Sequence, residues 1–351
     1  MKLWFVEPYD DELLSSWLIR TAIAQGCQPL TLTHKIWGKS WRPWTSDLDL
    51  NIDSEYLQIL LSNNMSQEQL LLLTLKNENN IINSRSPQGR WITKLGVRSL
   101  DRTGGLRFCP VCLNQQAFLK KSWRLAWNVC CPQHRCLLQT ICIDCSLPFS
   151  PHKLSYNRLD IRYCVRCGHD LSSQISLISS NEIFNVQRKL NSYIKVGDRY
   201  SDNDLSVSKV FDKYHFLLRF LNHACAIQTV SDIRLINDLN IEVSKKSRSS
   251  ENVETMSPDW LFELMKIISV IQDKSAIELA IYFKEFGYTK QSFTSRITMN
   301  RYSFNKDFLE HLPSLPRKKK QLIKKKFTHT VEPLPKEQVL EKWNQLLMKL
   351  K

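Results

Sequence analysis

Cysteines carry most of the chemistry in this sequence. The 351 residues include eleven, and nine of them fall between positions 109 and 167. Cys109-Pro-Val-Cys112 precedes Cys131-Pro-Gln-His134 by 18 residues, and Cys142-Ile-Asp-Cys145 precedes Cys164-Val-Arg-Cys167 by the same interval. A pair of ligands two residues apart turns both side chains toward one metal ion, and zinc prefers thiolate and imidazole ligands. The pattern therefore predicts zinc binding.

The two sets of four ligands form an internal repeat, because each ligand position recurs 33 residues later. This repeat predicts two tandem zinc ribbons with two zinc ions per chain. The expected ligands are Cys109, Cys112, Cys131 and His134 for one ion and Cys142, Cys145, Cys164 and Cys167 for the other. Four protein ligands leave no coordination position for water, so both ions are expected to be structural. Disulfides are the alternative, but the sequence has no export signal to support them.

The remaining cysteines are expected to play no part in metal binding. Cys130 lies next to Cys131, but only Cys131 keeps both the C-x-x-H spacing and the 33-residue repeat. Cys27, Cys136 and Cys225 have no partner at this spacing and are expected to be buried small hydrophobic residues. His169 is expected at the surface or beside the second zinc site.

A second candidate site lies near the C-terminus. Residues 277–297 predict a helix, a turn at Gly287 and a second helix, which together resemble a helix-turn-helix. The second helix carries side chains suited to DNA: Lys290, Gln291, Ser292, Ser295 and Arg296. Arginine pairs with guanine, glutamine with adenine, and hydroxyl groups bind phosphate. Any helical hairpin has this outline, so DNA contact and simple packing both fit.

The C-terminal tail has two features with open interpretations. Seven of ten residues are basic: Arg317, Lys318, Lys319, Lys320, Lys324, Lys325 and Lys326. Such a run is either a solvated charged segment or a non-specific phosphate-binding one. The final predicted helix, 336–351, aligns Val339, Trp343, Leu346, Leu347 and Leu350. That stripe is either core for the preceding domain or a docking surface for a partner helix.

Helices are expected to position these groups. Asp10 predicts the N-cap of a first helix that ends at Gly26 and buries Leu13, Leu14, Trp17, Leu18 and Ala22. Another helix starts near Thr33, with His34 on its surface, and Ser66 predicts the cap of a third, 67–75. The Asn- and Ser-rich stretch 76–90 predicts a loop. Trp123 and Trp127 are expected to pack against a neighbouring domain.

The fold class predicted is mainly α, multidomain, with two small α+β zinc ribbons. Further amphipathic helices are expected at 180–193, at 207–225 and from Asp259, with an exposed linker at 237–257. The predicted divisions are a helical domain at 1–105, tandem zinc ribbons at 106–172, a helical region at 173–240, a helix-turn-helix-like domain at 255–312, and the basic tail with its helix at 313–351.

The composition narrows the class of protein. A net charge of +15 suggests a polyanionic partner such as nucleic acid. Only nine glycines are present, and neither a dinucleotide-binding nor a P-loop motif occurs. No apolar run has the length of a membrane span and no secretory segment opens the chain, so a cytoplasmic protein is expected.

Four ordered blocks resemble the TniQ/TnsD family of transposition proteins. They are residues 8–20, beginning Pro-Tyr-Asp-Asp-Glu, residues 107–112, with the first cysteine pair, residues 122–127, Ser-Trp-Arg-Leu-Ala-Trp, and residues 131–138, with the Cys-Pro-Gln-His segment. Their order and spacing fit the family's defining domain over roughly residues 5–170. The rest of the chain is similar only in its helical, basic character.

The resemblance implies a target-site selector of a mobile element. Such proteins bind target DNA directly or through an RNA-guided CRISPR effector complex, and they recruit the AAA+ ATPase regulator TnsC. Members that work with CRISPR complexes form dimers, so a homodimer is implied here. The same eight residues are implied as zinc ligands.

Three classes of function fit the sequence to different degrees. A non-enzymatic targeting adaptor leads, and a sequence-specific zinc-containing protein acting on an attachment site or promoter without a CRISPR partner is its alternative. A pure protein-bridging subunit is a second class. A metal-dependent nuclease is disfavoured, because no H-E-x-x-H motif and no acidic cluster accompany the cysteine pairs.

Overall fold

The computed structural model describes residues 4–39, 41–61, 65–83, 89–95, 106–176, 180–196, 207–241, 252–297, 305–314 and 335–349. The chain divides into two units, Met1–Ser314 and Leu315–Lys351. Helices dominate both units, and the described strand pairing consists of isolated bridges. The mainly α fold class is therefore confirmed.

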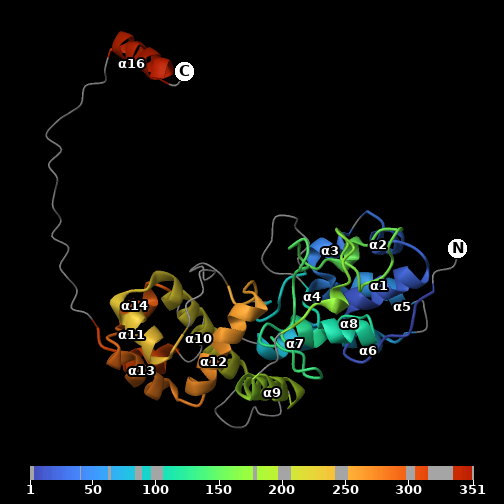
Figure 1. Cartoon of the computed structure of the whole chain (residues 1–351), viewed down its shortest axis with the longest axis horizontal. Helices are drawn as coiled ribbons and strands as arrows, with labels where there is room; N and C mark the ends of the chain where they lie inside the picture. The colour runs from blue at the N-terminus through green and yellow to red at the C-terminus, as the bar shows by residue number, and fades with distance from the viewer. Residues whose placement is uncertain are drawn as a thin grey trace. The chain divides into compact units, whose positions relative to one another are not determined.

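Among the described residues, seven helices precede the cysteine-rich segment (Figure 1). They are α1 (Leu14–Ala24), α2 (Pro29–Trp37), α3 (Pro43–Ser46), α4 (Leu48–Asn51), α5 (Ser54–Leu61), α6 (Gln67–Leu72) and α7 (Lys76–Ile82). The apolar stripe predicted for the first helix is fully buried, and Gly26 follows its end with φ +66°. Ser66 forms a capping box with Gln69, as expected for α6, although this helix ends at Leu72.

The predicted cap of α1 is wrong. The helix begins at Leu14, four residues after Asp10. Its first N–H groups are satisfied from distant parts of the chain: the Leu14 N–H donates to Leu73 O at 2.8 Å and the Ser15 N–H to Asp49 Oδ1 at 2.7 Å. Because tertiary partners satisfy the N–H groups that a local cap would have satisfied, Asp10 is not needed there.

The loop predicted at 76–90 is also wrong in its first half, which forms α7. Two of its asparagines, Asn79 and Asn83, are buried and form hydrogen bonds to the backbone, whereas Asn77 and Asn80 are exposed. The Asn79 side chain accepts hydrogen bonds from the Gly89 N–H and the Asn83 side chain, and Ile82 is buried. Tertiary contacts have overridden a composition that favours loops.

The cysteine-rich segment contains one short α-helix, α8 (Pro110–Gln115), and three 3₁₀ turns, η1 (Lys121–Arg124), η2 (Pro151–Lys153) and η3 (Leu171–Ser173). Five antiparallel bridges lie within it or at its ends: Phe108 with Gln139, Cys130 with Leu137, Ile141 with Pro148, Ser155 with Arg158, and Tyr163 with Asp170. A segment with so little regular structure needs metal ions or neighbouring helices for its stability.

The helices that follow are α9 (Asn181–Val196), α10 (Val207–Ile227), α11 (Val230–Asp238), α12 (Pro258–Ile271), α13 (Ala276–Glu285), α14 (Lys290–Thr294) and α15 (Asn305–Glu310). Central α10 contacts α9, α11 and α12. Stacked and edge-on aromatic rings fill the core between α10, α13, α14 and α15, including Phe220 against Phe293 at 4.5 Å between ring centroids.

One end of the predicted 237–257 linker is packed instead of exposed. Val253 and Met256 are buried, and Glu254 pairs with His215 of α10 at 2.9 Å. Glu254 also accepts the Trp91 N–H at 2.8 Å. Although burial opposes its charge, these donors hold the pKa of Glu254 at about 2.

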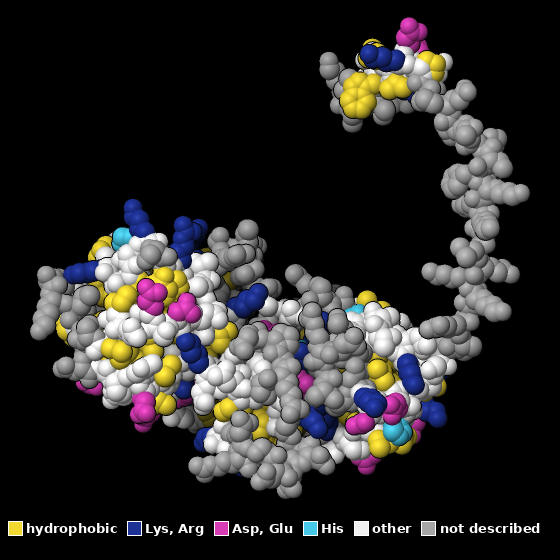
Figure 2. Space-filling model, turned by 180° about the vertical axis from the view of Figure 1, so that it is seen from behind, with side chains coloured by type: hydrophobic (Ala, Val, Ile, Leu, Met, Phe, Trp, Pro, Cys, Tyr) yellow, Lys and Arg dark blue, Asp and Glu magenta, His cyan; other side chains and the backbone are white. Residues whose placement is uncertain are grey.

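The second unit contains α16 (Lys336–Lys349). Val339, Leu340 and Trp343 are each more than half exposed on it. Figure 2 shows hydrophobic side chains gathered on this helix. Leu346, Leu347 and Leu350 of the predicted stripe lie outside the described side chains. None of the helices in the described ranges has the length and hydropathy needed to cross a bilayer.

Candidate metal centres and nucleic-acid interface

The first predicted ligand set converges on one point. The ligand atoms of Cys109, Cys112, Cys131 and His134 all lie within 4.8 Å of one another. His134 Nδ1 lies 3.4 Å from Cys109 Sγ and 3.3 Å from Cys112 Sγ, and the sulfurs of Cys112 and Cys131 are 3.6 Å apart. These separations match the edges of a tetrahedron around an ion bound at about 2.0–2.3 Å.

The second set converges in the same way. Cys142 Sγ lies 3.6 Å from Cys167 Sγ, and Cys145 Sγ lies 3.6 Å from Cys164 Sγ. All four sulfurs fall within 4.8 Å of one another, and all eleven cysteines are free thiols. Sulfurs this close without a disulfide, in a tetrahedral set, fit zinc. The chain therefore has two structural zinc sites.

A shared backbone turn explains how three of the four pairs form. The residue directly after each second ligand has a left-handed backbone: Arg135 has φ +52°, Ser146 +56° and Gly168 +83°. In each case its N–H donates back to the carbonyl of the first ligand, at 2.8, 2.9 and 3.0 Å. This turn points both ligands to the same side.

The pair Cys109 and Cys112 uses a helix instead. Pro110 opens α8, and the Cys112 N–H donates to Cys109 Sγ at 3.4 Å. Hydrogen bonds from the Cys112, Cys131 and Cys136 thiols lower the pKa of Cys109, while the hydrogen bond to Cys109 raises the pKa of Cys112. Zinc must therefore displace protons from part of the cluster when it binds.

Cys136 is the feature of this site that sequence reasoning missed. It is buried, as expected, but its Sγ lies 3.4 Å from Cys109 Sγ, in direct contact with a zinc ligand. Its position two residues after His134 was the available signal. Cys225 is buried as predicted, whereas Cys27 is only partly buried. His169 lies beside the second site, with Nδ1 2.9 Å from Asp144 Oδ2.

Trp127 packs as predicted against helices outside the ribbons. Its Nε1–H donates to Asn191 Oδ1 of α9 at 2.8 Å, and its ring lies 4.8 Å from Phe211 of α10. The Trp91 ring contacts the Trp127 ring edge-on, with 5.6 Å between their centroids. Trp123 is buried as well. The first zinc site is therefore continuous with the helical core.

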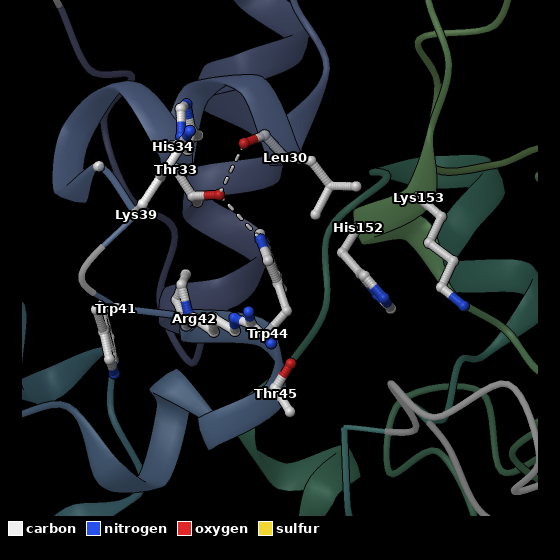
Figure 3. Close-up of a pocket in the computed structure, with 12 residues that line it drawn as sticks. Leu30, Thr33, His34, Lys39, Trp41, Arg42, Trp44, Thr45, His152 and Lys153 are labelled. Carbon is white, nitrogen blue, oxygen red and sulfur yellow. Dashed lines mark hydrogen bonds between the residues drawn. The ribbon is translucent and has the colours of Figure 1, made fainter.

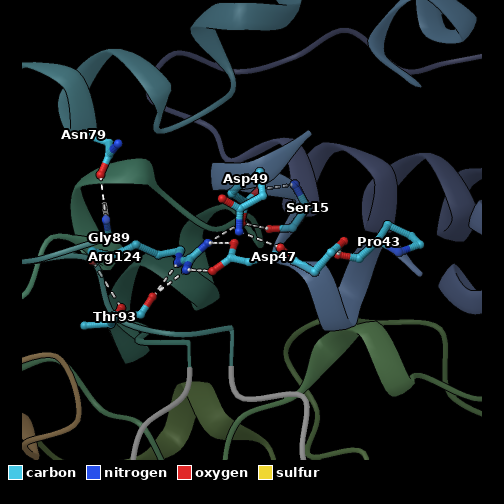
Figure 4. Close-up of polar contacts among 10 residues, drawn as sticks. Ser15, Pro43, Asp47, Asp49, Asn79, Gly89, Thr93 and Arg124 are labelled. Atoms are coloured by element: carbon cyan, nitrogen blue, oxygen red, sulfur yellow. Dashed lines mark hydrogen bonds and ion pairs between the residues drawn. The ribbon is translucent and has the colours of Figure 1, made fainter. Parts of the chain in front are cut away.

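A buried ion network that no sequence pattern predicted joins η1 to the N-terminal helices (Figure 4). Arg124 donates to both carboxylate oxygens of Asp47, at 2.7 and 2.6 Å, and to Asp49 Oδ2 at 2.9 Å. Its Nε–H donates to Thr93 O at 3.0 Å, and Ser15 donates twice to Asp49. Burial raises the pKa of Asp49 to about 6 despite the Arg124 charge. Burial opposes the charge of Arg124, but the two carboxylates raise its pKa overall.

The predicted helix-turn-helix outline is present in part. Helix α13 ends before Gly287, which has φ +85°, and α14 begins at Lys290. However, α14 is only five residues long. Thr289 and Ser292 form its capping box, so the Ser292 hydroxyl serves the helix start.

The candidate DNA-reading residues differ in how exposed they are and in the hydrogen bonds that they already make within the protein. Ser295 is exposed, but its hydroxyl donates to the Gln291 carbonyl at 2.7 Å. Arg296 bonds Asp232 of α11 through both terminal nitrogens, at 2.6 and 3.0 Å. Lys290 is partly buried and Gln291 is exposed. The seven basic tail residues, Arg317 to Lys326, lie outside the described residues, so DNA contact by either group stays a prediction.

Comparison with known proteins identifies the N-terminal part of the chain. Residues 3–138 match the TniQ family model. This part of the chain is similar to the TniQ family. The match covers α1 to α8 and the whole first zinc site, and it ends four residues before Cys142, the first ligand of the second site. No curated protein matches the chain.

Proposed function

We propose that this protein is a non-enzymatic adaptor that selects the target of a transposition reaction. In this role it recognises target DNA or an RNA-guided CRISPR effector complex and recruits an AAA+ ATPase regulator of the TnsC type. The observation that carries the proposal is the TniQ match over residues 3–138. A homodimer belongs to the same proposal.

The chemistry of the zinc sites supports an adaptor. Each site offers four protein ligands, whereas a catalytic zinc site keeps a position for water or substrate. The three cysteine ligands of the first site are buried, so its ion fixes the backbone and does not face a substrate. A net charge of +15 supports a nucleic-acid partner, alone or inside an RNA–protein assembly.

DNA contact is proposed through α14 and the basic tail. Lys290, Gln291 and Ser295 would approach the duplex first. Both terminal nitrogens of Arg296 donate to Asp232, so Arg296 would have to leave Asp232 before it could contact a base. The tail residues, Arg317–Lys320 and Lys324–Lys326, would contribute phosphate contacts that do not depend on base sequence.

Direct recognition of an attachment site or promoter, without a CRISPR partner, is the second candidate. It is favoured by the capped turn between α13 and α14, which gives a compact hairpin on a basic chain. In that case the isolated protein discriminates between duplex sequences. An effector-dependent adaptor discriminates only in the presence of the guide complex.

The test combines capture and DNA binding. Purified protein is mixed with the ATPase and, separately, with the effector complex, and co-elution is measured by gel filtration. Duplex binding is followed by anisotropy between 50 and 200 mM salt. Phosphate contacts make the affinity fall with salt concentration, so the salt slope separates them from base contacts. Failure to capture the ATPase in any of these mixtures would refute the adaptor.

Two variants separate base reading from phosphate binding. Arg296→Ala is expected to weaken discrimination between sites, and Lys318→Ala to weaken all sites alike. Because Arg296 also pairs with Asp232, the unfolding temperature of its variant is measured alongside. Equal losses at every sequence for both variants would remove the base-reading role.

A further inference from the structure

A pocket outside the zinc sites has the composition of a nucleotide-binding site. It has a volume of about 440 Å³ and lies between α2, α3 and η2, so one wall comes from the N-terminal helices and the other from the second zinc ribbon (Figure 3). This volume is within the range of pockets that hold small ligands. The site lies apart from the predicted DNA-reading helix α14.

Two tryptophans form rigid walls of this pocket. Trp41 stacks on Tyr56, with ring centroids 4.5 Å apart and an angle of 8°, and Trp37 contacts it edge-on. Trp44 donates its Nε1–H to Thr33 Oγ1 at 3.0 Å. Both rings are therefore held in place before any ligand arrives, which lowers the entropic cost of stacking a base against them.

The rim of the pocket is cationic. Lys39, Arg42 and Lys153 line it and are exposed, and no acidic side chain of the described residues lines it. Figure 3 shows Arg42 on the same side as the two tryptophans and Lys153 across the pocket, beside His152. Cations on both sides of an aromatic cleft suit a ligand that combines a planar ring with phosphate.

His152 gives an independent indication of a ligand. Its side chain is 1% exposed, its ring stacks on Trp44 at 5.2 Å, and it lines the pocket. Among the described residues, neither ring nitrogen has a hydrogen-bond partner. Burial lowers the pKa of His152 to about 3, so the ring is neutral and can both donate and accept. Leaving such a group unpaired inside a protein is unfavourable, and a base edge or phosphate at this wall would satisfy it.

We propose that this pocket binds a nucleotide of single-stranded nucleic acid, with its base stacked on Trp41, the edge of the base toward the His152 ring that covers Trp44, and its phosphate near Lys39, Arg42 and Lys153. The proposal rests on the proposed function and deepens it, because guide pairing leaves one target strand unpaired and accessible to an adaptor. A duplex does not fit, since its bases are already stacked and its backbone lies outside them.

The test uses the full-length protein and fluorescein-labelled oligomers of fifteen thymidines or fifteen uridines. Anisotropy is measured from 50 to 200 mM KCl, and the DNA and RNA probes distinguish the two sources of the strand. The double variant Arg42→Glu/Lys153→Glu is expected to bind at least about tenfold more weakly and to reduce the salt slope by about 1.4, since each phosphate contact contributes about 0.7 for single strands. Trp41→Leu is expected to weaken binding about tenfold through lost stacking.

The matched control is Arg234→Glu/Lys284→Glu, which reverses two exposed charges on α11 and α13. It should leave affinity within about twofold of the unmodified protein. Ultraviolet crosslinking of a 5-bromouracil oligomer, with mass spectrometry, should label the peptide that contains Trp41 and Trp44.

Three results would overturn the pocket. The first is that the pocket and control variants weaken the affinity for the single-stranded probe equally. The second is that the crosslinks fall only in other segments. The third is that the protein binds no single-stranded probe at 50 mM KCl but does bind an acidic aromatic peptide. ATPase capture is measured on the same variants. If capture is retained while one of these three results appears, the pocket proposal fails and the adaptor function stands.

Discussion

Replacing Arg124 tests whether the buried ion network holds the N-terminal helices to the zinc-ribbon segment. In Arg124→Met the aliphatic volume is kept and the charge is lost, so Asp49, which is fully buried, keeps no cationic partner. Breaking a buried pair by removing one member costs about 3–5 kcal/mol of unfolding free energy. We expect a loss in that range near pH 8.

The dependence of this loss on pH gives the sharper result. The pKa of Asp49 is already raised to about 6, from 3.8, so the folded state binds a proton more tightly than the unfolded state. Stability from this group is therefore present at low pH and declines as pH rises from about 4 to 6. Without Arg124 the folded pKa rises further, because the attraction that lowered it is gone. The variant should then recover part of its loss at pH 5, where Asp49 becomes neutral.

Urea unfolding followed by tryptophan fluorescence and circular dichroism, at pH 5 and pH 8, measures this effect. The matched control is Lys266→Met, which breaks the exposed pair with Glu263 at 2.8 Å and should cost less than about 1 kcal/mol. Arg124→Met/Asp49→Asn should lose less than Arg124→Met alone at pH 8. A loss below 1 kcal/mol, or an equal loss at both pH values, would refute the network's role.

Three further predictions concern the metal sites and the core. Cys112→Ser and Cys145→Ser should each lower zinc content, measured by elemental analysis, from two ions per chain to about one, and a total of one ion in the unmodified protein would contradict the tandem sites. Gly168→Ala should destabilise the second site selectively, seen as faster zinc release to a chelator. The φ of Gly168 is +83°, and an added Cβ would lie 2.5 Å from the Arg158 guanidinium, which would have to move away from the Cys164 carbonyl that it bonds at 3.2 Å. Gly26→Ala, which also has positive φ but open space, is the control. Glu254→Gln should remove the acid-dependent loss of stability that the unmodified protein shows as pH falls from 4.5 toward 2, because the depressed pKa of Glu254 favours the folded state only while the carboxylate is charged. An unchanged acid unfolding midpoint would contradict that role.

Sequence spacing found the zinc sites because their ligands are local. Cys109 and Cys112 are placed by one helical turn, and the other three pairs by a four-residue turn, so residue types and intervals suffice. The contact between Cys136 and Cys109 depends on how two turns face each other across 27 residues, and spacing rules carry no such information.

The features that the sequence did not reveal all depend on distant partners. Arg124 meets Asp47 and Asp49 across more than 70 residues, and the start of α1 is satisfied by Leu73 and Asp49 instead of Asp10. In both cases a polar group far along the chain replaces the local partner that sequence rules assume. The outline of α13 and α14 was predictable from its capping residues, whereas the pairing of Arg296 with Asp232 was not.

The two zinc sites differ in how strongly they are coupled to the rest of the molecule. Gln187 of α9 accepts the N–H groups of Val129 and Cys130, both at 3.0 Å, and donates to the Cys130 carbonyl at 2.8 Å, directly beside the ligand Cys131. In the second site Cys145 is only partly buried and Cys167 is exposed.

Loss of the first ion would therefore disturb α9 and the aromatic core around Trp127, while loss of the second would disturb its own turns and η2, which packs against α2. For this reason Cys112→Ser should lower the unfolding temperature more than Cys145→Ser, although both remove one ion. The first site thus links residues 3–138, which match the TniQ family model, to the helices that follow them.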